Sequence, residues 1–422
     1  MKMTVTEKIL AHAAGKSHVS PGDIVNVSPD IIMCNDATTH ITIDIFEKKL
    51  KNRKVKNPSK NVWVIDHNFP VNDIKTAEAH KKMKIFADRH GIANFHNGDG
   101  VCHQILLERY ANPGQIIIGA DSHTCTIGAI GAFATGLGST DITGAIATGE
   151  TWFKVPETIK INMTGKLNKG VYHRDIILYI IGLTGADGAN YKAMEFTGQA
   201  VREMTVPERA VLCNMAVEAG AKNGIVEADE MCRRYLSEQG RDADRSYFKS
   251  DEDACYEKII NVDLSRIKPG CAIPHNVDNY DELENIEKNR VKIHQGFIGA
   301  CSNGRIENLR EAAEVLMNRK VNQQVKLMIS PASQSVYKQA LNEGLMDIFI
   351  SAGAVVLNPS CSACWGGCQG IMAENQVSIS TATRNFRGRT GHPDSQIYLA
   401  SAAAVAASCI EGFITDPVKY IR

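Results

Sequence analysis

The 422-residue chain contains no run that approaches the roughly 20 apolar residues needed to cross a bilayer. It has no excess of either charge, because Lys plus Arg and Asp plus Glu both number 47. Nothing therefore predicts a surface for nucleic acid or anionic lipid. The first residues lack the charged-then-apolar pattern of a secretion signal, and the phosphate-binding Gly-x-x-x-x-Gly-Lys-[Ser/Thr] motif is absent. We expect a cytosolic protein that binds neither nucleic acid nor membrane.

The order of its apolar segments predicts an α/β fold, because strand-like runs alternate with helical patterns. Strands are predicted over residues 62–65, 115–119, 159–162, 224–226, 325–329 and 354–357. Helices are predicted over residues 74–90, 175–183, 206–219, 306–320 and 333–343. A chain of this length is too long for one hydrophobic core, so we expect more than one domain.

Two changes in composition predict domain boundaries. A Gly/Ala/Thr-rich region ends near residue 155, where a new strand begins, and residues 275–290 are polar and acidic, as in a linker. The expected domains are therefore residues 1–155, 156–285 and 286–422. The charge-rich residues 228–263 predict a solvated helical excursion.

Three cysteines lie where predicted buried strands end. Cys301 follows a short apolar stretch, and the pair Cys361 and Cys364 follows residues 354–357 and a turn at 358–360. The ends of strands are the usual place for ligands in open α/β sheets. Three thiolates are one fewer than normally hold a cubane iron–sulfur cluster. A missing protein ligand would leave one iron free to act as a Lewis acid.

The chain has twelve cysteines, and most of them need no special role. In a reducing compartment a thiol is usually a small buried hydrophobic group, and only a minority bind metal. The Cys-x-x-Cys spacing of Cys361 and Cys364 departs from this pattern, because two such thiols can converge on one metal or cluster.

Asp/His pairs follow two of the predicted strands. Residues 62–65 lead to Asp66 and His67, and residues 115–119 lead to Asp121, Ser122 and His123. A carboxylate beside an imidazole can orient it or change its pKa. A third histidine, His103, lies between the pairs in a glycine-rich setting. One such histidine is more often structural, but three within 58 residues favour a polar active-site cleft.

A basic segment near the C-terminus is a candidate carboxylate clamp. Arg384 and Arg389 are five residues apart, with Gly388 between them. Arginine forms bidentate pairs with carboxylates, so this segment could hold a di- or tricarboxylate. A solvated basic loop is the alternative, and the short distance in sequence to Cys361 and Cys364 favours the clamp.

Taken together, these segments resemble the aconitase superfamily. The likeness covers essentially the whole chain and is closest to the large subunits of isopropylmalate and homoaconitate isomerases. Its most specific piece is residues 119–126 (GADSHTCT), followed by residues 298–305 (IGACSNGR), the Cys-x-x-Cys and residues 384–389 (RNFRGR). The resemblance implies three α/β domains around a central iron–sulfur cluster cleft, without the swivelling fourth domain of the family.

The resemblance also implies a role for each candidate residue. Cys301, Cys361 and Cys364 would hold a [4Fe–4S] cluster, with Asn214 supporting it. Acid/base and substrate-orienting roles would fall to Asp66, His67, His103, Asp121, Ser122, His123 and Glu218. Arg384 and Arg389 would bind the substrate carboxylates. Two departures from the family pattern are Thr383, where the family usually has Asn, and the additional thiol of Cys368.

The implied activity is that of a hydro-lyase which moves a hydroxyl group by dehydration and rehydration. The first candidate is the isomerisation of 2-isopropylmalate to 3-isopropylmalate in leucine synthesis, and homoaconitate hydration and 2,3-dimethylmalate dehydration are chemically equivalent. In the family, a serine and a further arginine come from the swivelling domain. We therefore expect this chain to need a separate small subunit.

Two other classes of protein remain open from the sequence. The first is a non-enzymatic [4Fe–4S] sensor or electron carrier, in which Cys368 supplies a fourth thiolate. The second is a structural zinc protein that uses the Cys-x-x-Cys with Cys368 or His392, because structural zinc requires four closed ligands. Neither class accounts for the Asp/His pairs.

Overall fold

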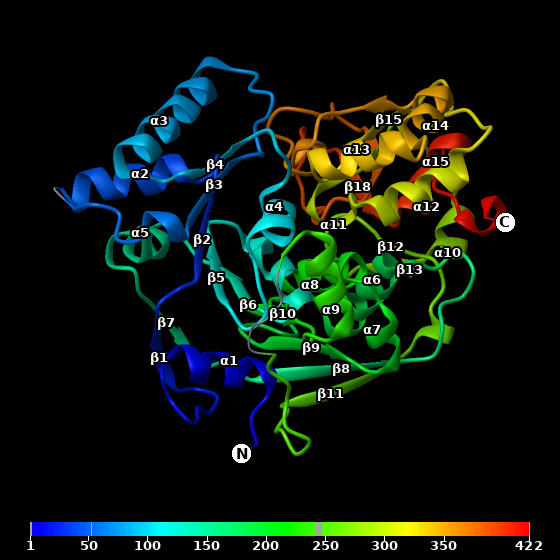
Figure 1. Ribbon diagram of the computed structural model, residues 1–422. Helices are drawn as coiled ribbons and strands as arrows, with labels where there is room; N and C mark the ends of the chain where they lie inside the picture. Colours follow the sequence, from blue (N-terminus) through cyan, green and yellow to red (C-terminus); the bar gives the residue numbers. More distant parts are fainter. Residues whose placement is uncertain (1, 52, 242–246, 422) are drawn as a thin grey trace.

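The computed structural model describes residues 2–51, 53–241 and 247–421, and its strands form four sheets (Figure 1). The first 150 residues lie to the left, the next hundred at the lower right and the C-terminal part at the upper right. A capping box at Thr4 and Glu7 starts α1 (Val5–Ala13). A small sheet then pairs β1 (Ile24–Val27) antiparallel with β7 (Thr151–Lys154).

The N-terminal sheet is parallel, with strand order β4-β3-β2-β5-β6. Its strands are β2 (Ile31–Asn35), β3 (Asn61–Ile65), β4 (Asn94–Asn97), β5 (Ile116–Gly119) and β6 (Phe133–Gly136). Its helices are α2 (Thr39–Lys49), η1 (Pro58–Lys60), α3 (Ile74–His90), α4 (Cys102–Arg109), η2 (Ser122–Ile130) and α5 (Ser139–Thr148). Because parallel strands all point the same way, the loops that follow β2, β3 and β5 meet at one edge.

The second sheet is also parallel, with order β10-β9-β8-β11. It comprises β8 (Thr158–Thr164), β9 (Ala193–Thr197), β10 (Asn223–Ile225) and β11 (Lys258–Asp263). Its helices are α6 (His173–Thr184), α7 (Gln199–Glu203), α8 (Val206–Met215), η3 (Ala216–Ala219), α9 (Glu230–Glu238) and η4 (Leu264–Arg266). Thr205 caps α8, and Pro207 lies in its first turn, where a proline costs no hydrogen bond.

The third sheet has seven strands in the order β13-β12-β18-β17-β14-β15-β16. They are β12 (Gly270–Ala272), β13 (Tyr280–Glu282), β14 (Gln295–Ile298), β15 (Lys326–Ile329), β16 (Val355–Val356), β17 (Val377–Ser380) and β18 (Gln396–Leu399). Strands β14 to β18 pair in parallel, and β12 pairs antiparallel with its neighbours. The helices are α10 (Leu283–Glu287), α11 (Ala300–Asn303), α12 (Ile306–Leu316), α13 (Gln334–Asn342), α14 (Leu345–Ala352), η5 (Ser362–Cys364), α15 (Ala402–Glu411) and η6 (Pro417–Tyr420).

The predicted elements occur where expected, with differences at their ends. Residues 74–90 form α3, and the strands predicted at 62–65 and 115–119 are β3 and β5. The helix predicted over 206–219 ends as an α-helix at Met215 and continues as the 3-10 turn η3. The helix predicted over 306–320 ends at Leu316.

Two segments correct the sequence interpretation. Residues 228–263 are not one helical excursion: only α9 is helical, residues 242–246 lie outside the described residues, and 258–263 form β11. Residues 275–290 are not a plain linker, because they contain β13 and α10, whose Leu283 and Ile286 are buried. Both errors concern strands that pairing with neighbouring strands determines, β11 with β8 and β13 with β12.

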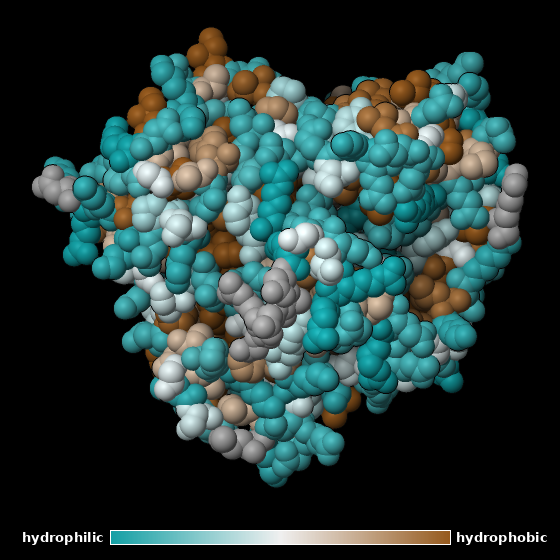
Figure 2. Space-filling model, viewed as in Figure 1, coloured by the Kyte–Doolittle hydropathy of each residue, from teal (hydrophilic) through white to brown (hydrophobic). Residues whose placement is uncertain are grey.

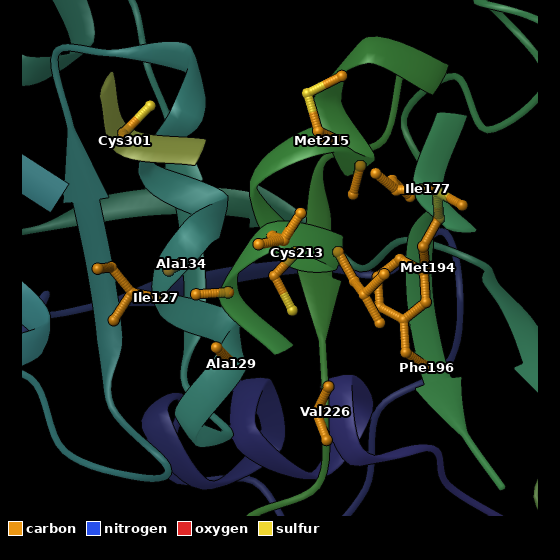
Figure 3. Close-up of a cluster of buried hydrophobic side chains, with 14 of the residues drawn as sticks. Ile127, Ala129, Ala134, Ile177, Met194, Phe196, Cys213, Met215, Val226 and Cys301 are labelled. Carbon is orange, nitrogen blue, oxygen red and sulfur yellow. The ribbon is translucent and has the colours of Figure 1, made fainter. Parts of the chain in front are cut away.

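The main hydrophobic core joins the three large sheets and includes all three candidate cysteines. Figure 3 shows part of it, with Ile127 and Ala129 of η2, Cys213 of α8 and Phe196 of β9. Cys301 of α11 belongs to the same cluster. The cysteines are therefore embedded in the packing of the fold.

The surface seen in Figure 2 is mostly hydrophilic, with separate hydrophobic patches on the two upper lobes. Among the described residues, no helix combines the length and the apolar character needed to cross a membrane.

The contact between η2 and β10 requires glycine at position 128. A Cβ added there would lie 1.7 Å from the carbonyl oxygen of Gly224. Backbone cannot move aside easily, so Gly128→Ala should lower the free energy of unfolding by about 3 kcal/mol, the upper range for overpacking. Gly144→Ala on α5 is the control, because nothing lies within 4 Å of its added Cβ. That change should be neutral or stabilise by up to about 1 kcal/mol. Equal urea midpoints for the two variants would contradict the account.

Candidate active site

The loops after β2, β3 and β5 bring three aspartates to the same edge of the N-terminal sheet. Asp36 follows β2, Asp66 follows β3, and Asp121 lies between β5 and η2. All three carboxylates accept hydrogen bonds from backbone N–H groups. Asp36 accepts those of Asp66 (2.9 Å) and His67 (2.8 Å). Asp66 accepts that of Cys102 (2.7 Å), and Asp121 accepts that of His123 (2.8 Å). These bonds fix the loops that carry the histidines.

Two of the histidines share the carboxylate of Asp121. His103 Nε2 lies 2.9 Å from Asp121 Oδ1, and His67 Nε2 lies 3.4 Å from Asp121 Oδ2. The other ring nitrogen of His67, Nδ1, lies 2.8 Å from Asp66 Oδ1. Both nitrogens of His67 therefore face carboxylates, which favours the imidazolium form.

A second network joins the first and second sheets to the C-terminal segment. His123 Nε2 lies 2.8 Å from Glu218 Oε1. Arg384 donates from Nε to both oxygens of Glu218 (2.9 and 3.1 Å) and from Nη2 to Ser122 Oγ (2.9 Å). Residues from three distant parts of the chain are thus held by one ion-pair network.

The three cysteines lie in or directly before two short helices, α11 and η5, which have an unusual backbone. Cys301 lies in α11, which packs against α4, α8 and η5. Ala300 (φ 64°) and Ser362 (φ 53°), each next to a cysteine, occupy the left-handed region. This conformation costs a non-glycine residue of order 1–3 kcal/mol and clusters at functional sites. Asn214 donates to Cys301 Sγ (3.1 Å).

These groups surround a single cavity of about 90 Å³. Ten of the sequence-predicted site residues line it: His67, His103, Asp121, Ser122, His123, Cys301, Cys361, Cys364, Arg384 and Arg389. The remaining three, Asp66, Asn214 and Glu218, each hydrogen-bond to one of these ten. The structure therefore brings the whole predicted set together.

The geometry argues against the zinc alternative. Among the described residues, the one group of three or more His, Cys, Asp and Glu ligand atoms within 4.8 Å of one another is Asp36, Asp66 and His67, so neither Cys368 nor His392 joins Cys361 and Cys364 in such a group. Zn–S bonds of about 2.3 Å would draw the sulfurs of one ion closer together than this. The Asp36 carboxylate already accepts the backbone N–H groups of Asp66, His67 and Asn68 and is not free to bind a metal ion. His392 is exposed beside Asp394 and does not line the cavity.

Cys368 also lies outside the cavity lining. Its Sγ lies 3.6 Å from the carbonyl oxygen of His67. Trp365, three residues earlier, does line the cavity. Its ring packs edge-on against the His67 ring, and the Arg389 guanidinium lies over it. Among the described cysteines, three thiols and not four therefore face the cavity.

Burial and neighbouring charges set the protonation of the site. Burial opposes a charge on His67, but Asp66 and Asp121 outweigh it and raise the His67 pKa well above its usual value. Burial likewise opposes ionisation of Asp121, yet His103 and the other donors hold its pKa well below the usual range. The hydrogen bond with Cys361 lowers the pKa of Cys364, and Arg389 helps. The cavity therefore has one thiol with a lowered pKa, that of Cys364, beside charged side chains that are already paired with groups of opposite charge.

Sequence reasoning missed two residues at the end of β2. Asn35 donates from Nδ2 to Asp121 Oδ2 (3.1 Å). Asp36 accepts, besides two backbone N–H groups, the backbone N–H of Asn68 (2.8 Å) and its side-chain amide (3.0 Å), and lies 3.1 Å from His80 Nε2. The signal was present, because residues 31–34 are an apolar run followed by polar residues, as at the other two strands.

The family assignment follows from the comparison with known proteins. Residues 7–412 match the aconitase family (aconitate hydratase), and the chain belongs to this family. It is a hydro-lyase family, so the cavity is the candidate site for removing and adding water.

Three of the relatives that are similar to this chain are named as large subunits. The chain is 49% identical to the 3-isopropylmalate dehydratase large subunit of Acetivibrio thermocellus, over 99% of both chains. It is 47% identical to the probable 3-isopropylmalate dehydratase large subunit of Methanothermobacter thermautotrophicus, again over 99% of both. A probable methanogen homoaconitase large subunit of the same organism is 46% identical, over 99% of this chain and 98% of that one.

Among solved structures, Thermococcus kodakaraensis aconitase X (holo-form) has a similar fold. Its TM-score is 0.52 at 12% sequence identity, over 98% of this chain and 92% of that chain. This likeness supports the aconitase-like arrangement of several parallel sheets.

In the cluster-free protein, the imidazole of His67 should stay protonated at neutral pH. The folded chain holds a proton that the unfolded chain releases near pH 6.5. The resulting stabilisation is complete below about pH 6.5 and is lost as the pH rises through the raised pKa of His67. Nitrogen NMR of labelled histidine should show both ring nitrogens protonated at pH 7, and Asp66→Asn should lower the pKa. Titration near 6.5 in both proteins would contradict the assignment.

The Asp36 carboxylate should be essential for the loop at residues 66–68. Asp36→Asn puts an amide N–H₂ where donors already point, and leaves buried donors unsatisfied at about 1–3 kcal/mol each. We expect the free energy of unfolding to fall by about 3 kcal/mol. Asp23→Asn is the control, because the exposed Asp23 accepts one N–H from Ser20. It should change stability by less than about 0.5 kcal/mol, and equal denaturation midpoints would refute the role of Asp36.

Proposed function

We propose that this chain is the large, catalytic subunit of an iron–sulfur hydro-lyase that converts 2-isopropylmalate into 3-isopropylmalate by dehydration and rehydration. The observation that carries the proposal is one cavity lined by three cysteines, three histidines and two arginines, whose histidines belong to networks centred on Asp121 and on Glu218. The names of the relatives at 47–49% identity support the same substrate. A cytosolic location stays a prediction.

Cys301, Cys361 and Cys364 are the proposed ligands of a [4Fe–4S] cluster. The donor set fits, because three thiols surround a buried cavity, Asn214 donates to Cys301, and Thr383 Oγ1 lies 3.7 Å from Cys364 Sγ. Hydrogen bonds to ligand sulfurs are a normal feature of such sites. When bound, the cluster would supply a Lewis acid for the hydroxyl and carboxylate of the substrate.

The chain's own residues would bind the substrate and move protons. Arg384 and Arg389 face the cavity from the C-terminal segment and would hold carboxylates. His67 and His103, whose Nε2 atoms face Asp121, and His123, whose Nε2 faces Glu218, would hold protons or relay them between these carboxylates and the substrate as the hydroxyl group leaves and returns. General acid/base groups of this kind typically contribute 10²–10⁴-fold.

A small subunit would complete the site. The relatives are large subunits, which implies a partner chain. We propose that this partner carries the swivelling domain, with the serine that removes the proton and another arginine for the substrate. We also propose three α/β domains around the cavity, at residues 1–155, 156–285 and 286–422. The three large sheets support this division, although β12 and β13 join the third sheet.

Homoaconitate hydration is the second candidate function, because a homoaconitase large subunit is 46% identical to this chain. A 2,3-dimethylmalate substrate would undergo the same chemistry, but none of the relatives described above is named for it. A sensor or electron carrier is less favoured, because Cys368 does not line the cavity and the histidine network would have no task.

Removing a cluster ligand should abolish cluster binding. Cys301→Ser, Cys361→Ser and Cys364→Ser should each lose most of the bound iron and acid-labile sulfide after anaerobic reconstitution, because two thiolates hold a cluster poorly. Cys368→Ser is the matched control and should retain both. Loss of the cluster in the Cys368 variant alone would identify Cys368 as a ligand and favour the carrier.

The test of function is turnover with and without a small subunit. The reconstituted chain should be inactive alone and should isomerise 2-isopropylmalate when mixed with an isopropylmalate dehydratase small subunit. Homoaconitate, tested with the same mixture, should react at least tenfold more slowly. Full activity of the single chain would refute the need for a partner, and a preference for homoaconitate would select the second candidate.

A further inference from the structure

Arg174, in the first turn of α6, is a buried cation with almost no partners. Its side chain is fully buried (0% exposed). Nη2 donates to the carbonyl oxygen of Ala382, while Nε and Nη1 are buried and have no hydrogen-bond partner among the described residues. An unpaired buried charge is strongly unfavourable, so such a group calls for a nearby anion.

The other buried arginines of the described chain are satisfied differently. Arg209, on the adjacent helix α8, makes a bidentate pair with Asp229 (2.8 and 2.6 Å). Arg305 donates to Gln104 Oε1 (2.9 Å) and to the carbonyl oxygen of Ser302 (3.0 Å). Arg209 Nε and Arg305 Nη2 also lack a hydrogen-bond partner, but of these three fully buried arginines only Arg174 makes a single hydrogen bond and leaves two nitrogens without a partner.

The carboxylates near Arg174 are already in use. Asp175 accepts the backbone N–H groups of Tyr172 (2.8 Å) and Gly270 (3.0 Å), and burial raises its pKa to about 7, which weakens it as a counter-ion. Glu218 is held by His123 and Arg384. No carboxylate of the described chain therefore neutralises Arg174.

The remaining groups near Arg174 that could carry a negative charge are the cysteines of the candidate cluster site. Ala382, its one hydrogen-bond acceptor, precedes Thr383, whose hydroxyl lies 3.7 Å from Cys364 Sγ. Ala382 packs in the same buried cluster as Cys301, Cys361 and Cys364. Burial lowers the pKa of Arg174 to about 10, and the charges of Cys364, Glu218 and Cys301 oppose that shift.

We propose that Arg174 is the buried counter-ion of the iron–sulfur cluster, a positioning residue whose positive charge stabilises the cluster and its thiolate ligands from the side of α6. The proposal rests on the proposed function, because it assumes that the three cysteines hold a cluster. It predicts that Arg174 destabilises the empty protein and stabilises the loaded one. A residue needed only for packing would stabilise both.

The test compares Arg174→Met with the wild-type chain, each full length, with and without a cluster reconstituted from ferrous iron and sulfide. The cluster-free variant should melt at a higher temperature than the cluster-free wild type, because the uncompensated charge is gone. Its cluster should lose iron to a chelator about 10–100-fold faster, the range for loss of a group that supports metal ligands. The midpoint potential of the cluster should become more negative.

Two further variants make the result specific. Arg174→Lys keeps the charge and should restore most of the cluster retention. Arg209→Met breaks the pair with Asp229 and should lower the melting temperature of both forms, with the midpoint potential unchanged. If Arg174→Met destabilises both forms equally, fails to fold, or leaves iron loss and potential unchanged, the counter-ion role is wrong.

Failure of the proposed function would look different. In that case the wild-type chain itself would take up no iron and sulfide, whatever residue stands at position 174. A wild-type chain that binds a cluster, beside an Arg174→Met variant of equal cluster stability and potential, would overturn only the inference about Arg174.

Discussion

The carboxylate of Asp121 is the contact on which the arrangement of the cavity depends. It lies within 3.4 Å of His67 and within 2.9 Å of His103, and it accepts the backbone N–H of His123 and the side-chain amide of Asn35. One carboxylate thus sets the direction of two imidazole rings and the start of η2. Because these donors hold its pKa well below the usual range, the charge persists at any physiological pH.

Most of the charged side chains around the cavity are already paired with groups of opposite charge or with hydrogen-bond donors of the chain. Asp36 is saturated by N–H donors, His67 lies between two carboxylates, and Glu218 lies between His123 and Arg384. In a low-dielectric interior, a fully paired network of this kind is rigid and favours a single arrangement of its side chains. The left-handed Ala300 and Ser362 add strain beside the cysteines, which the surrounding core must hold in place. We interpret the cavity as preorganised for a cluster and an anionic substrate.

Much of this site could be predicted from the sequence because its residues follow strong local patterns. Apolar runs at 62–65 and 115–119 end in Asp/His pairs, and in a parallel sheet such strand ends converge. Asp36 was missed because residues 31–34 were not recognised as a strand. Arg174 was missed for a different reason: its lack of a partner depends on where Ala382 and the carboxylates of other elements lie. The short strand β13 and the strand β11 were missed because pairing with neighbours, and not their own composition, determines them.

The central claim is that three thiolates hold a four-iron cluster and leave one iron without a protein ligand. Electron paramagnetic resonance of the anaerobically purified chain, before and after mild oxidation, tests it most directly when iron and sulfide are assayed in the same sample. The account predicts a three-iron signal that appears on oxidation and disappears when ferrous iron is added. A cluster that keeps all four irons would contradict it, as would zinc without sulfide.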